Sequence, residues 1–373
     1  MDLKKQKKIL FIVGTRPEAI KICPLIKEAS TFFDIFVLGT GQHYESVINA
    51  FSLFGVSINK IFPLKKFKNI GEQLSYFQKN ISENLDIYKP DLVVVHGDTT
   101  SCFAGALSAY LHKIDIAHVE AGLRTQNMYS PFPEEMFRKW TDAVAKFCYA
   151  PTAGAKNNLI CEGISEDKIF VTGNTIVDAL NYISLNDQFT ETDKTILNEI
   201  NQFSNSKNGY FLVTLHRNEI KNTHLSLLSK AIVNLAKKKN YAIIWPLHPN
   251  KIIKNIVLLQ TKKHAHVYTL PVANYNLFLK IMQKSSLIIT DSGGIQEEAT
   301  ILAKKILVLR NETERLEVLQ SGIALMGGID DKNLEDNIDF LLNLPKNTPV
   351  NTSIFGSGDA SIKIVSHWKE KLN

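Results

Sequence analysis

The stretch LVVVHGDTTS (92–101), followed after a helical run by IDIAHVEAGLRTQNMYSPFPEE (114–135), decides how this chain folds. Each segment opens with a short apolar run that is typical of a buried strand. The residues between them begin with Thr and Ser and continue with apolar residues at helical spacing. The pattern predicts a strand–helix–strand unit, in which ligands bind outside the carboxyl ends of the strands. Asp98 and Glu120 stand where these two strands should end, so we expect both to line one crevice.

A loop with Arg124 and two prolines then leads to Glu134 and Glu135, in the first turn of the next expected helix. A single acid after a strand is usually a helix cap, and this alternative applies to each carboxylate taken alone. Three acids that converge beside an arginine, on a loop stiffened by proline, require more than capping. We therefore interpret Asp98, Glu120 and Glu134 as an acid–base site.

Length and composition are those of a globular protein with about two domains of roughly 150 to 200 residues each. Of its 373 residues, 45% are hydrophobic and 21% are charged, and the net charge of +6 comes from scattered lysines without interleaved aromatic residues. Nucleic acid is therefore not an expected partner. No apolar run approaches membrane-spanning length, and the four cysteines have neither metal-ligand nor disulfide spacing. We expect a cytoplasmic protein that interacts with no membrane.

Strands alternate with helices in both halves, which predicts an α/β fold of parallel sheets covered on both faces. KKILFIVG (7–14) is the expected first strand, and the polar segment 182–209 is the expected domain junction. The predicted domains are residues 1–181 and 182–357. A helix expected at 358–373 could pack back on the first domain.

Two further segments favour the binding of an anion. Arg16 and Lys21 lie at or near a helix N-terminus, where free N–H groups and the helix dipole favour negative charge, although a plain surface position is an equally good interpretation of Arg16. In TDSGGIQEE (290–298), Gly293 and Gly294 allow a phosphate to approach backbone N–H groups at another helix start. A simple strand–helix turn, in which glycine supplies only backbone freedom, is the alternative.

Neighbours of this turn favour the phosphate interpretation. Glu298 lies one turn into the helix, where it can accept hydrogen bonds from ribose hydroxyls, and Arg315 after the next strand can offer a bidentate fork to a diphosphate. His216 ends another expected strand on the side of the crevice, although a histidine there is as often structural. Together these residues suggest a nucleoside diphosphate bound without a metal.

Seven segments stand in order along the chain: GTRPEAIK (14–21), HGDTTS (96–101), HVEAGLRT (118–125), SPFPEE (130–135), VTGNTIVDAL (171–180), TDSGGIQEEA (290–299) and TER (313–315). Together they resemble the non-hydrolysing UDP-N-acetylglucosamine 2-epimerases, from about residue 8 to residue 330. The resemblance implies a GT-B-like architecture of two Rossmann-type domains, with parallel sheets that face each other across a cleft holding the active site. It also implies reversible inversion at C2 to give UDP-N-acetylmannosamine, a precursor of bacterial surface polysaccharides.

The resemblance also implies a role for each matching residue. Asp98, Glu120 and Glu134 provide the acid–base chemistry, and His216 joins the catalytic set by stabilising the departing diphosphate. The residues implied to hold the UDP group are Arg16, Lys21, His216, Phe278, Ser292, Gly293, Gly294, Glu298 and Arg315. Neither a metal nor another cofactor is implied, and we expect a homodimer.

The chain departs from the family pattern in places. Asn218 stands where an arginine is common, and Leu316 stands where proline is usual. Tyr44, Glu45 and Asn80 break the pattern of a site at which a second substrate molecule activates some relatives. We therefore expect no activation of that kind.

Three other functions fit parts of the pattern. A hydrolysing epimerase, which releases UDP and N-acetylmannosamine, would use the same fold, but such relatives do not usually carry SPFPEE (130–135). A GT-B glycosyltransferase would share the nucleotide-binding half without needing three acids, and a nucleotide-sugar sensor would need the acids only as caps. Epimerisation uses at least two carboxyl groups, because the C2 proton leaves from one face and returns on the other. A modified UDP-hexosamine is an alternative substrate.

Overall fold

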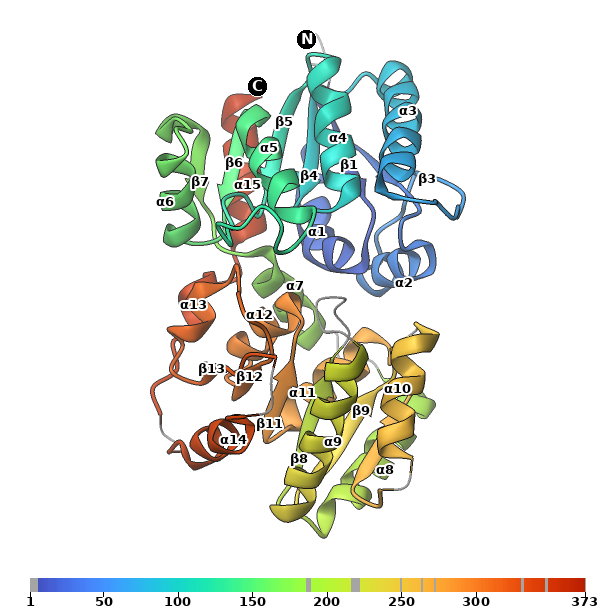
Figure 1. Ribbon diagram of the computed structural model, residues 1–373. Coiled ribbons are helices and arrows are strands. Elements are labelled where there is room, and N and C mark those ends of the chain that lie inside the picture. Colours follow the sequence, from blue (N-terminus) through green and yellow to red (C-terminus); the bar gives the residue numbers. More distant parts are fainter. Residues whose placement is uncertain are drawn as a thin grey trace. The chain divides into compact units, whose positions relative to one another are not determined.

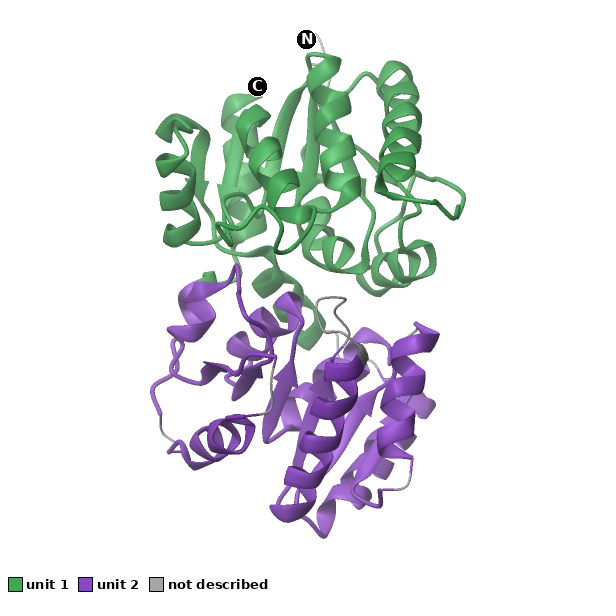
Figure 2. Ribbon diagram, viewed as in Figure 1, with its two compact units in different colours: residues 1–185, 355–373 green, residues 186–354 purple. Residues whose placement is uncertain are grey.

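The computed structural model describes residues 6–185, 189–215, 222–248, 250–262, 264–271, 273–329, 332–345 and 348–372. The chain divides into two compact units (Figure 2). Unit 1 comprises residues 1–185 and 355–373, and unit 2 comprises residues 186–354. In the described part of the chain, no helix is both long and apolar enough to span a membrane.

Unit 1 alternates strands and helices (Figure 1). Its strands are β1 (Lys8–Val13), β2 (Asp34–Gly39), β3 (Lys60–Ile61), β4 (Leu92–His96), β5 (Asp115–Val119), β6 (Phe147–Ala150) and β7 (Ile169–Val171). Its α-helices are α1 (Arg16–Ala29), α2 (Tyr44–Phe54), α3 (Ile70–Tyr88), α4 (Thr100–Leu111), α5 (Glu134–Val144), α6 (Ala153–Cys161), α7 (Thr175–Leu185) and α15 (Ala360–Lys371). The strand–helix–strand unit predicted around residues 92–120 is therefore β4–α4–β5.

Within the described residues, the strands of unit 1 form one seven-stranded sheet in the order β3-β2-β1-β4-β5-β6-β7. All of its pairings are parallel. The order reverses beside β1, which pairs with β2 on one side and with β4 on the other. In doubly wound sheets, ligands bind at the carboxyl edge beside such a reversal. The loops after β1 and β4 are therefore where a ligand site is expected in this unit.

Helices cover both faces of this sheet. Helices α3, α4 and α5 pack together on one face, and α1, α7 and α15 pack together on the other (Figure 1). Side chains of strand β1 pack against the helices on both faces. Leu10 and Ile12 share a buried cluster with Cys102 of α4, whereas Phe11 contacts Trp368 of α15. Because both faces are buried, β1 is apolar along nearly its whole length.

Helix α15 completes unit 1 although it follows unit 2 in the sequence. Trp368 is fully buried, and its ring meets those of Phe11, Phe33 and Tyr149 edge-on, with centroids 6.1, 6.3 and 6.2 Å apart. The start of the helix is fixed to α7 because the backbone N–H of Ser361 donates to Asp178 at 2.9 Å. Helix α15 therefore closes an aromatic cluster of the first unit.

Unit 2 repeats the same plan. Its strands are β8 (Tyr210–Thr214), β9 (Ala242–Pro246), β10 (Val267–Leu270), β11 (Leu287–Thr290), β12 (Ile306–Val308) and β13 (Ala324–Met326). Its α-helices are α8 (Glu191–Asn205), α9 (Asn222–Lys238), α10 (Lys251–Thr261), α11 (Tyr275–Lys284), α12 (Gly293–Ile301), α13 (Leu316–Leu319) and α14 (Leu334–Asn343). Short 3₁₀ segments lie at Glu166–Lys168 in unit 1 and at Thr352–Phe355, where the chain passes from unit 2 back to unit 1.

The described strands of unit 2 form a parallel sheet in the order β10-β9-β8-β11-β12-β13, so the reversal lies between β8 and β11. Helix α8 occupies about half of the polar segment 182–209, which was expected to be the domain junction and to lack a clear strand. Its N-terminus is fixed by a capping box between Thr190 and Asp193, and Ile200 is the apolar residue that it buries. Its apolar residues, Ile196, Leu197, Ile200 and Phe203, stand at helical spacing, so the sequence does carry a helical pattern within this polar segment.

We predict that Trp368→Ala lowers the free energy of unfolding of unit 1 by about 3–5 kcal/mol, because it removes a large buried ring from a close-packed cluster. Ile362→Ala is the matched control on the same helix, since Ile362 is 55% exposed. We expect the control to change stability by no more than about 0.5 kcal/mol. Urea denaturation followed by circular dichroism measures both. Equal effects of the two substitutions would show that α15 does not stabilise the unit.

Candidate active site

Two of the three predicted acids follow neighbouring strand ends in unit 1. Strands β4 and β5 pair in register up to His96 and Val119, and the N–H of Gly97 donates to the carbonyl of Val119 at 3.0 Å. Asp98 and Glu120 come directly after these positions. The carboxyl ends of parallel strands lie at one edge of a sheet, so both acids belong to that edge.

Glu120 is buried beside two basic residues. Its backbone has φ 68°, a left-handed conformation that is uncommon for a residue with a side chain. Nζ of Lys21 donates to its carboxylate, and Nε2 of His96 lies 3.5 Å from the same oxygen. In this structure, therefore, the ammonium group of Lys21, which the resemblance assigned to the UDP group, lies on Glu120.

Asp98 is half-buried and pairs with an arginine of helix α5. Nη2 of Arg138 donates to Oδ2 of Asp98, and Nη1 of Arg138 lies 3.2 Å from the carboxylate of Glu135. Glu134, the third predicted acid, is the first residue of the same helix. Helix α5 therefore carries the candidate acid Glu134 and also Arg138, the cation that binds the candidate acid Asp98.

The two adjacent glutamates at the start of α5 have different surroundings. Glu135 is fully buried and accepts hydrogen bonds from the backbone N–H groups of Thr125 and Gln126 at about 3.1 Å, so it fixes the preceding loop. Glu134 is half-buried. Glu135 therefore has a structural role in the loop, and the role of Glu134 as an acid stays a prediction.

Arg124 does not stand beside the acids, and the sequence-based expectation that it does is wrong. Its Nη2 donates to Asp142 at 2.7 Å and to Glu162 at 2.6 Å. Asp142 lies near the end of α5, the helix that follows this loop, and Glu162 follows α6, which the sequence did not connect with the loop. The arginine next to Asp98 is Arg138 instead.

Glu18 joins the loops that follow β1 and β4. Its carboxylate accepts the backbone N–H groups of Gly14 at 2.9 Å and Thr15 at 2.6 Å, and the hydroxyl of Thr99 at 2.6 Å. Thr99 is the residue after Asp98. Burial raises the pKa of Glu18 to about 7, although the hydrogen bonds from Thr99, Gly14 and Thr15 oppose the rise.

The Ser-Gly-Gly turn lies at the reversal of the sheet in unit 2, where β11 ends and α12 begins with Gly293. A Cβ on Gly293 would lie 2.5 Å from Nη1 of Arg315, whereas a Cβ on Gly294 would meet no atom of the described residues within 4 Å outside its own helical turn. The two glycines therefore have different reasons to lack a side chain. Gly293 makes room for Arg315, and Gly294 leaves open space at the helix start.

The guanidinium group of Arg315 is held by two buried acids. Nε donates to Glu297 at 2.6 Å, and Nη1 donates to Glu314. Glu314 in turn accepts from the buried Arg310 at 2.8 Å. This network orients the guanidinium group of Arg315 at the start of α12.

The other predicted UDP-binding residues occupy several places. Glu298 on α12 accepts the hydroxyl of Tyr275 at 2.6 Å, and Phe278 is buried one turn after Tyr275 on α11. Ser292 is the N-cap residue of α12, and Arg16 is the first residue of α1 in unit 1. His216 lies outside the described residues, as does Asn218.

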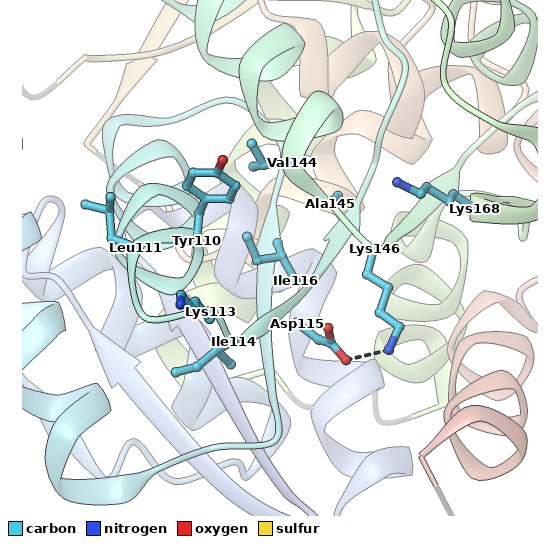
Figure 3. A pocket seen from close by; sticks show the side chains of 10 residues that line it. All are labelled: Tyr110, Leu111, Lys113, Ile114, Asp115, Ile116, Val144, Ala145, Lys146 and Lys168. Carbon is cyan, nitrogen blue, oxygen red and sulfur yellow. Dashed lines mark hydrogen bonds and ion pairs between the residues drawn. The ribbon is translucent and has the colours of Figure 1, made fainter.

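A pocket of ≈ 560 Å³ in unit 1 lies at the opposite edge of the sheet (Figure 3). Tyr110, Lys113, Asp115, Lys146 and Lys168 help to line it, and Lys146 donates to Asp115 at 2.6 Å. These residues begin or precede β5, β6 and β7, so the pocket is at the amino ends of the strands. It contains none of the candidate acids. Among the described residues, no three His, Cys, Asp or Glu side chains are grouped so as to hold a metal.

Three residues of the candidate site were missed in the sequence: Glu18, His96 and Arg138. Thr15-x-x-Glu18 has the spacing of a capping box, which could have drawn attention to Glu18. His96 is a polar residue at the end of an apolar strand, which is a position suited to a ligand edge. Arg138 offered no clear signal, because its partner Asp98 is 40 residues away in the sequence.

Known proteins resemble this chain over nearly its whole length. A family model described as UDP-N-acetylglucosamine 2-epimerase matches residues 26–369. The UDP-N-acetylglucosamine 2-epimerase of Neisseria meningitidis serogroup A is 36% identical over 365 residues, which cover 96% of this chain and 98% of the relative.

Solved structures agree with this match. The crystal structure of UDP-GlcNAc 2-epimerase from Neisseria meningitidis bound to UDP-GlcNAc has a TM-score of 0.91 and 35% identity, and covers 97% of this chain and 100% of that chain. The Methanocaldococcus jannaschii enzyme, in complex with UDP-GlcNAc and UDP, has a TM-score of 0.87 and 35% identity, and covers 97% and 99%. The predicted α/β fold with two Rossmann-type units of the GT-B-like class is confirmed.

We predict that Glu18 makes the stability of unit 1 depend on pH. An acid whose pKa is raised in the folded state stabilises that state below its unfolded pKa, and the contribution is lost as the pH rises through the folded value. Between pH 4.5 and pH 7, the wild type should therefore lose on the order of 3 kcal/mol relative to Glu18→Gln, which cannot ionise. Urea denaturation of both proteins at pH 5 and pH 8 tests this. A stability difference that does not change with pH would contradict it.

Proposed function

Because this chain belongs to the UDP-N-acetylglucosamine 2-epimerase family, we propose that it reversibly converts UDP-N-acetylglucosamine to UDP-N-acetylmannosamine by inversion at C2, without releasing the sugar. The observation that carries the proposal is the family match over residues 26–369, which includes the acids Asp98, Glu120 and Glu134. UDP-GlcNAc is the molecule bound in the Neisseria meningitidis relative.

The reaction proceeds by elimination and re-addition. A carboxylate takes the C2 proton while the bond from C1 to the UDP oxygen breaks, and the electron pair of the C2–H bond forms the C1–C2 double bond of a glycal. UDP then adds back to C1, and a second acid delivers a proton to the opposite face of C2. We assign these proton transfers to the set Asp98, Glu120 and Glu134.

Each acid has a partner suited to a proton-transfer role. Lys21 donates a hydrogen bond to Glu120, and Arg138 donates one to Asp98, so each of these two carboxylates is held in a fixed orientation. Glu134 opens helix α5, where the helix dipole favours negative charge.

Binding of the diphosphate is assigned to the other predicted residues. The start of α12 at Ser292, Gly293 and Gly294 offers backbone N–H groups, and Arg315 and Arg16 supply positive charge. Lys21 and His216 complete this set. The groups stabilise the charge that UDP gains as it leaves C1, and so favour its return over loss to solvent.

A hydrolysing epimerase is the second candidate, because the same acids could admit water to the glycal. The sequence SPFPEE (130–135), which resembles the non-hydrolysing relatives, favours the first candidate. On the same basis we propose that the product supplies surface polysaccharide synthesis and that the protein forms a homodimer.

We predict that the protein, incubated with UDP-N-acetylglucosamine in D2O, forms UDP-N-acetylmannosamine with deuterium at C2 in both nucleotide sugars at equilibrium. The proton taken by a carboxylate exchanges with solvent before re-addition, which explains the label. NMR and mass spectrometry measure the position and extent of labelling. Asp98→Asn should lower the rate at least ~100-fold, the usual scale for loss of a positioned acid or base.

Two outcomes would contradict this prediction. Protium retained at C2 of the mannosamine product would exclude elimination with solvent exchange. Free N-acetylmannosamine in amounts equal to the UDP released would assign the protein to the hydrolysing type. Lys113→Gln, in the pocket at the opposite edge of the sheet, is the control and should leave the rate unchanged.

We also predict that Gly293→Ala and Gly294→Ala both weaken UDP binding, but for different reasons. The first methyl group would displace the guanidinium of Arg315 from Glu297 and Glu314, so it should also lower stability. The second would enter open space, so stability should be unchanged while a bound phosphate is obstructed. Calorimetry with UDP and thermal denaturation measure the two effects. Wild-type UDP affinity in Gly294→Ala would place the phosphates elsewhere.

A further inference from the structure

A buried histidine that the proposed mechanism does not use lies within the sheet of unit 1. His118 is on β5 and has no exposed surface. Its Nδ1 lies 2.6 Å from Oδ1 of Asp142, and its Nε2 lies 2.7 Å from the carbonyl oxygen of Gly97. A backbone carbonyl can only accept a hydrogen bond, so Nε2 carries a hydrogen.

Asp142 also pairs with Arg124, which stabilises the ionised form of its carboxylate. Nη2 of Arg124 donates to Oδ2 at 2.7 Å, and the N–H of Gly122 donates to the same oxygen at 3.2 Å. Burial raises the pKa of Asp142, but His118 and Arg124 lower it by more, so the pKa lies below its usual value. An ionised Asp142 only accepts, so both ring nitrogens of His118 face hydrogen-bond acceptors.

The ring of His118 stands at the inner end of a series of basic and acidic side chains that alternate as far as the surface: Asp142, Arg124, Glu162 and Lys139. Arg124 binds Glu162 at 2.6 Å, and Lys139 lies 3.0 Å from the same carboxylate. The exposed fraction of the side chains rises from 0% at His118 to 27% at Glu162 and 31% at Lys139. A single buried charge would be costly, but here each charge has an opposite neighbour up to the surface.

Two thiols complete the surroundings of the ring. Sγ of Cys102 on α4 donates to the carbonyl of Gly97 at 3.2 Å, and Sγ of Cys148 on β6 lies 3.7 Å from the backbone oxygen of Asp142. Burial raises the pKa of both thiols well above the ordinary value. Both therefore stay neutral and leave the charges of the ion-pair series unchanged.

The segments that His118 joins are the ones that carry the proposed acids. Asp98 directly follows the carbonyl that Nε2 binds. Glu120 lies two residues after His118 on the same chain segment, in its left-handed conformation. Asp142 belongs to helix α5, which begins with Glu134. One ring therefore connects the ends of β4 and β5 with the helix of the third acid.

We propose that His118, held as a buried imidazolium by Gly97 and Asp142, is a positioning residue that sets the placement of the three acids for proton transfer at C2. The proposal rests on the proposed function, and it extends that function to a residue that acts through others. Loss of the ring lets the strand ends and α5 shift relative to one another. A displacement of ~1 Å at reacting groups costs about 100-fold in rate.

The protonation of the ring is tested without any assay of activity. Protein labelled with ¹⁵N-histidine is examined by ¹H–¹⁵N NMR at pH 8, where an ordinary histidine is mostly neutral. We expect two ring N–H groups for His118, assigned through their loss in His118→Gln. A single ring N–H would overturn the proposal. This result is independent of whether the protein epimerises any sugar.

The positioning role is tested by kinetics. His118→Gln should lower kcat about 100-fold while KM and UDP affinity change by less than about threefold. The isotope effect with substrate deuterated at C2 should rise, because proton transfer becomes slower, and a purely structural role would not raise it. His112→Gln is the matched control. The ring of His112, at the end of α4, donates through Nδ1 to the carbonyl oxygen of Ser108 at 2.8 Å, and its loss should leave kcat unchanged.

A second variant keeps the test decisive if His118→Gln does not fold. Asp142→Asn removes the negative charge of the side chain but keeps its size. His118 should then lose one ring N–H at pH 8, and kcat should fall about 10-fold or more. Unchanged kcat in a folded variant of either residue would overturn the proposal. If the wild type failed to exchange the C2 proton, the proposed function would fail, while two ring N–H groups would still establish the imidazolium.

Discussion

The structure depends on the reversal of strand order in each of its two parallel sheets. A parallel strand must be followed by a crossover, and crossovers of one hand place successive helices on one face until the order reverses. The loops on either side of the reversal then diverge and leave their backbone groups accessible. In unit 1, Glu18 ties these two loops together through Thr15 and Thr99. In unit 2, the hydroxyl of Thr214 donates to that of Thr290 at 2.8 Å, across the reversal between β8 and β11.

Buried charges at these edges are held by partners from distant segments. Lys21 binds Glu120, and Glu297 binds Arg315, with each pair almost removed from water. Desolvation offsets most of the attraction within such a pair, so the net gain in stability is small. What the pairs supply is a fixed position for the side chains of Glu120 and Arg315.

The sequence predicted the parts of this structure that rest on local patterns. Apolar runs followed by an acid located the strand ends before Asp98 and Glu120, because a buried parallel strand is apolar on both faces. Pairing between distant side chains has no such pattern, and for that reason Arg124 was wrongly placed beside the acids. His118 was missed for a related reason, since a polar residue inside an apolar run is hidden by its neighbours. Gly293 was recognised, but its contact with Arg315 could be found only from the fold.

The position of helix α15 sets an order in which the protein can be completed during synthesis. Residues 186–354 separate it from the rest of unit 1, and at about 5–20 residues per second the ribosome needs roughly 10 to 30 s to make them. Throughout that interval the surface formed by Phe11, Phe33 and Tyr149 lacks Trp368. When α15 is made, all the strands of unit 2 have already been synthesised, so unit 2 can fold before unit 1 is complete. The unit that emerges first from the ribosome is therefore completed only after the whole of unit 2 has been made.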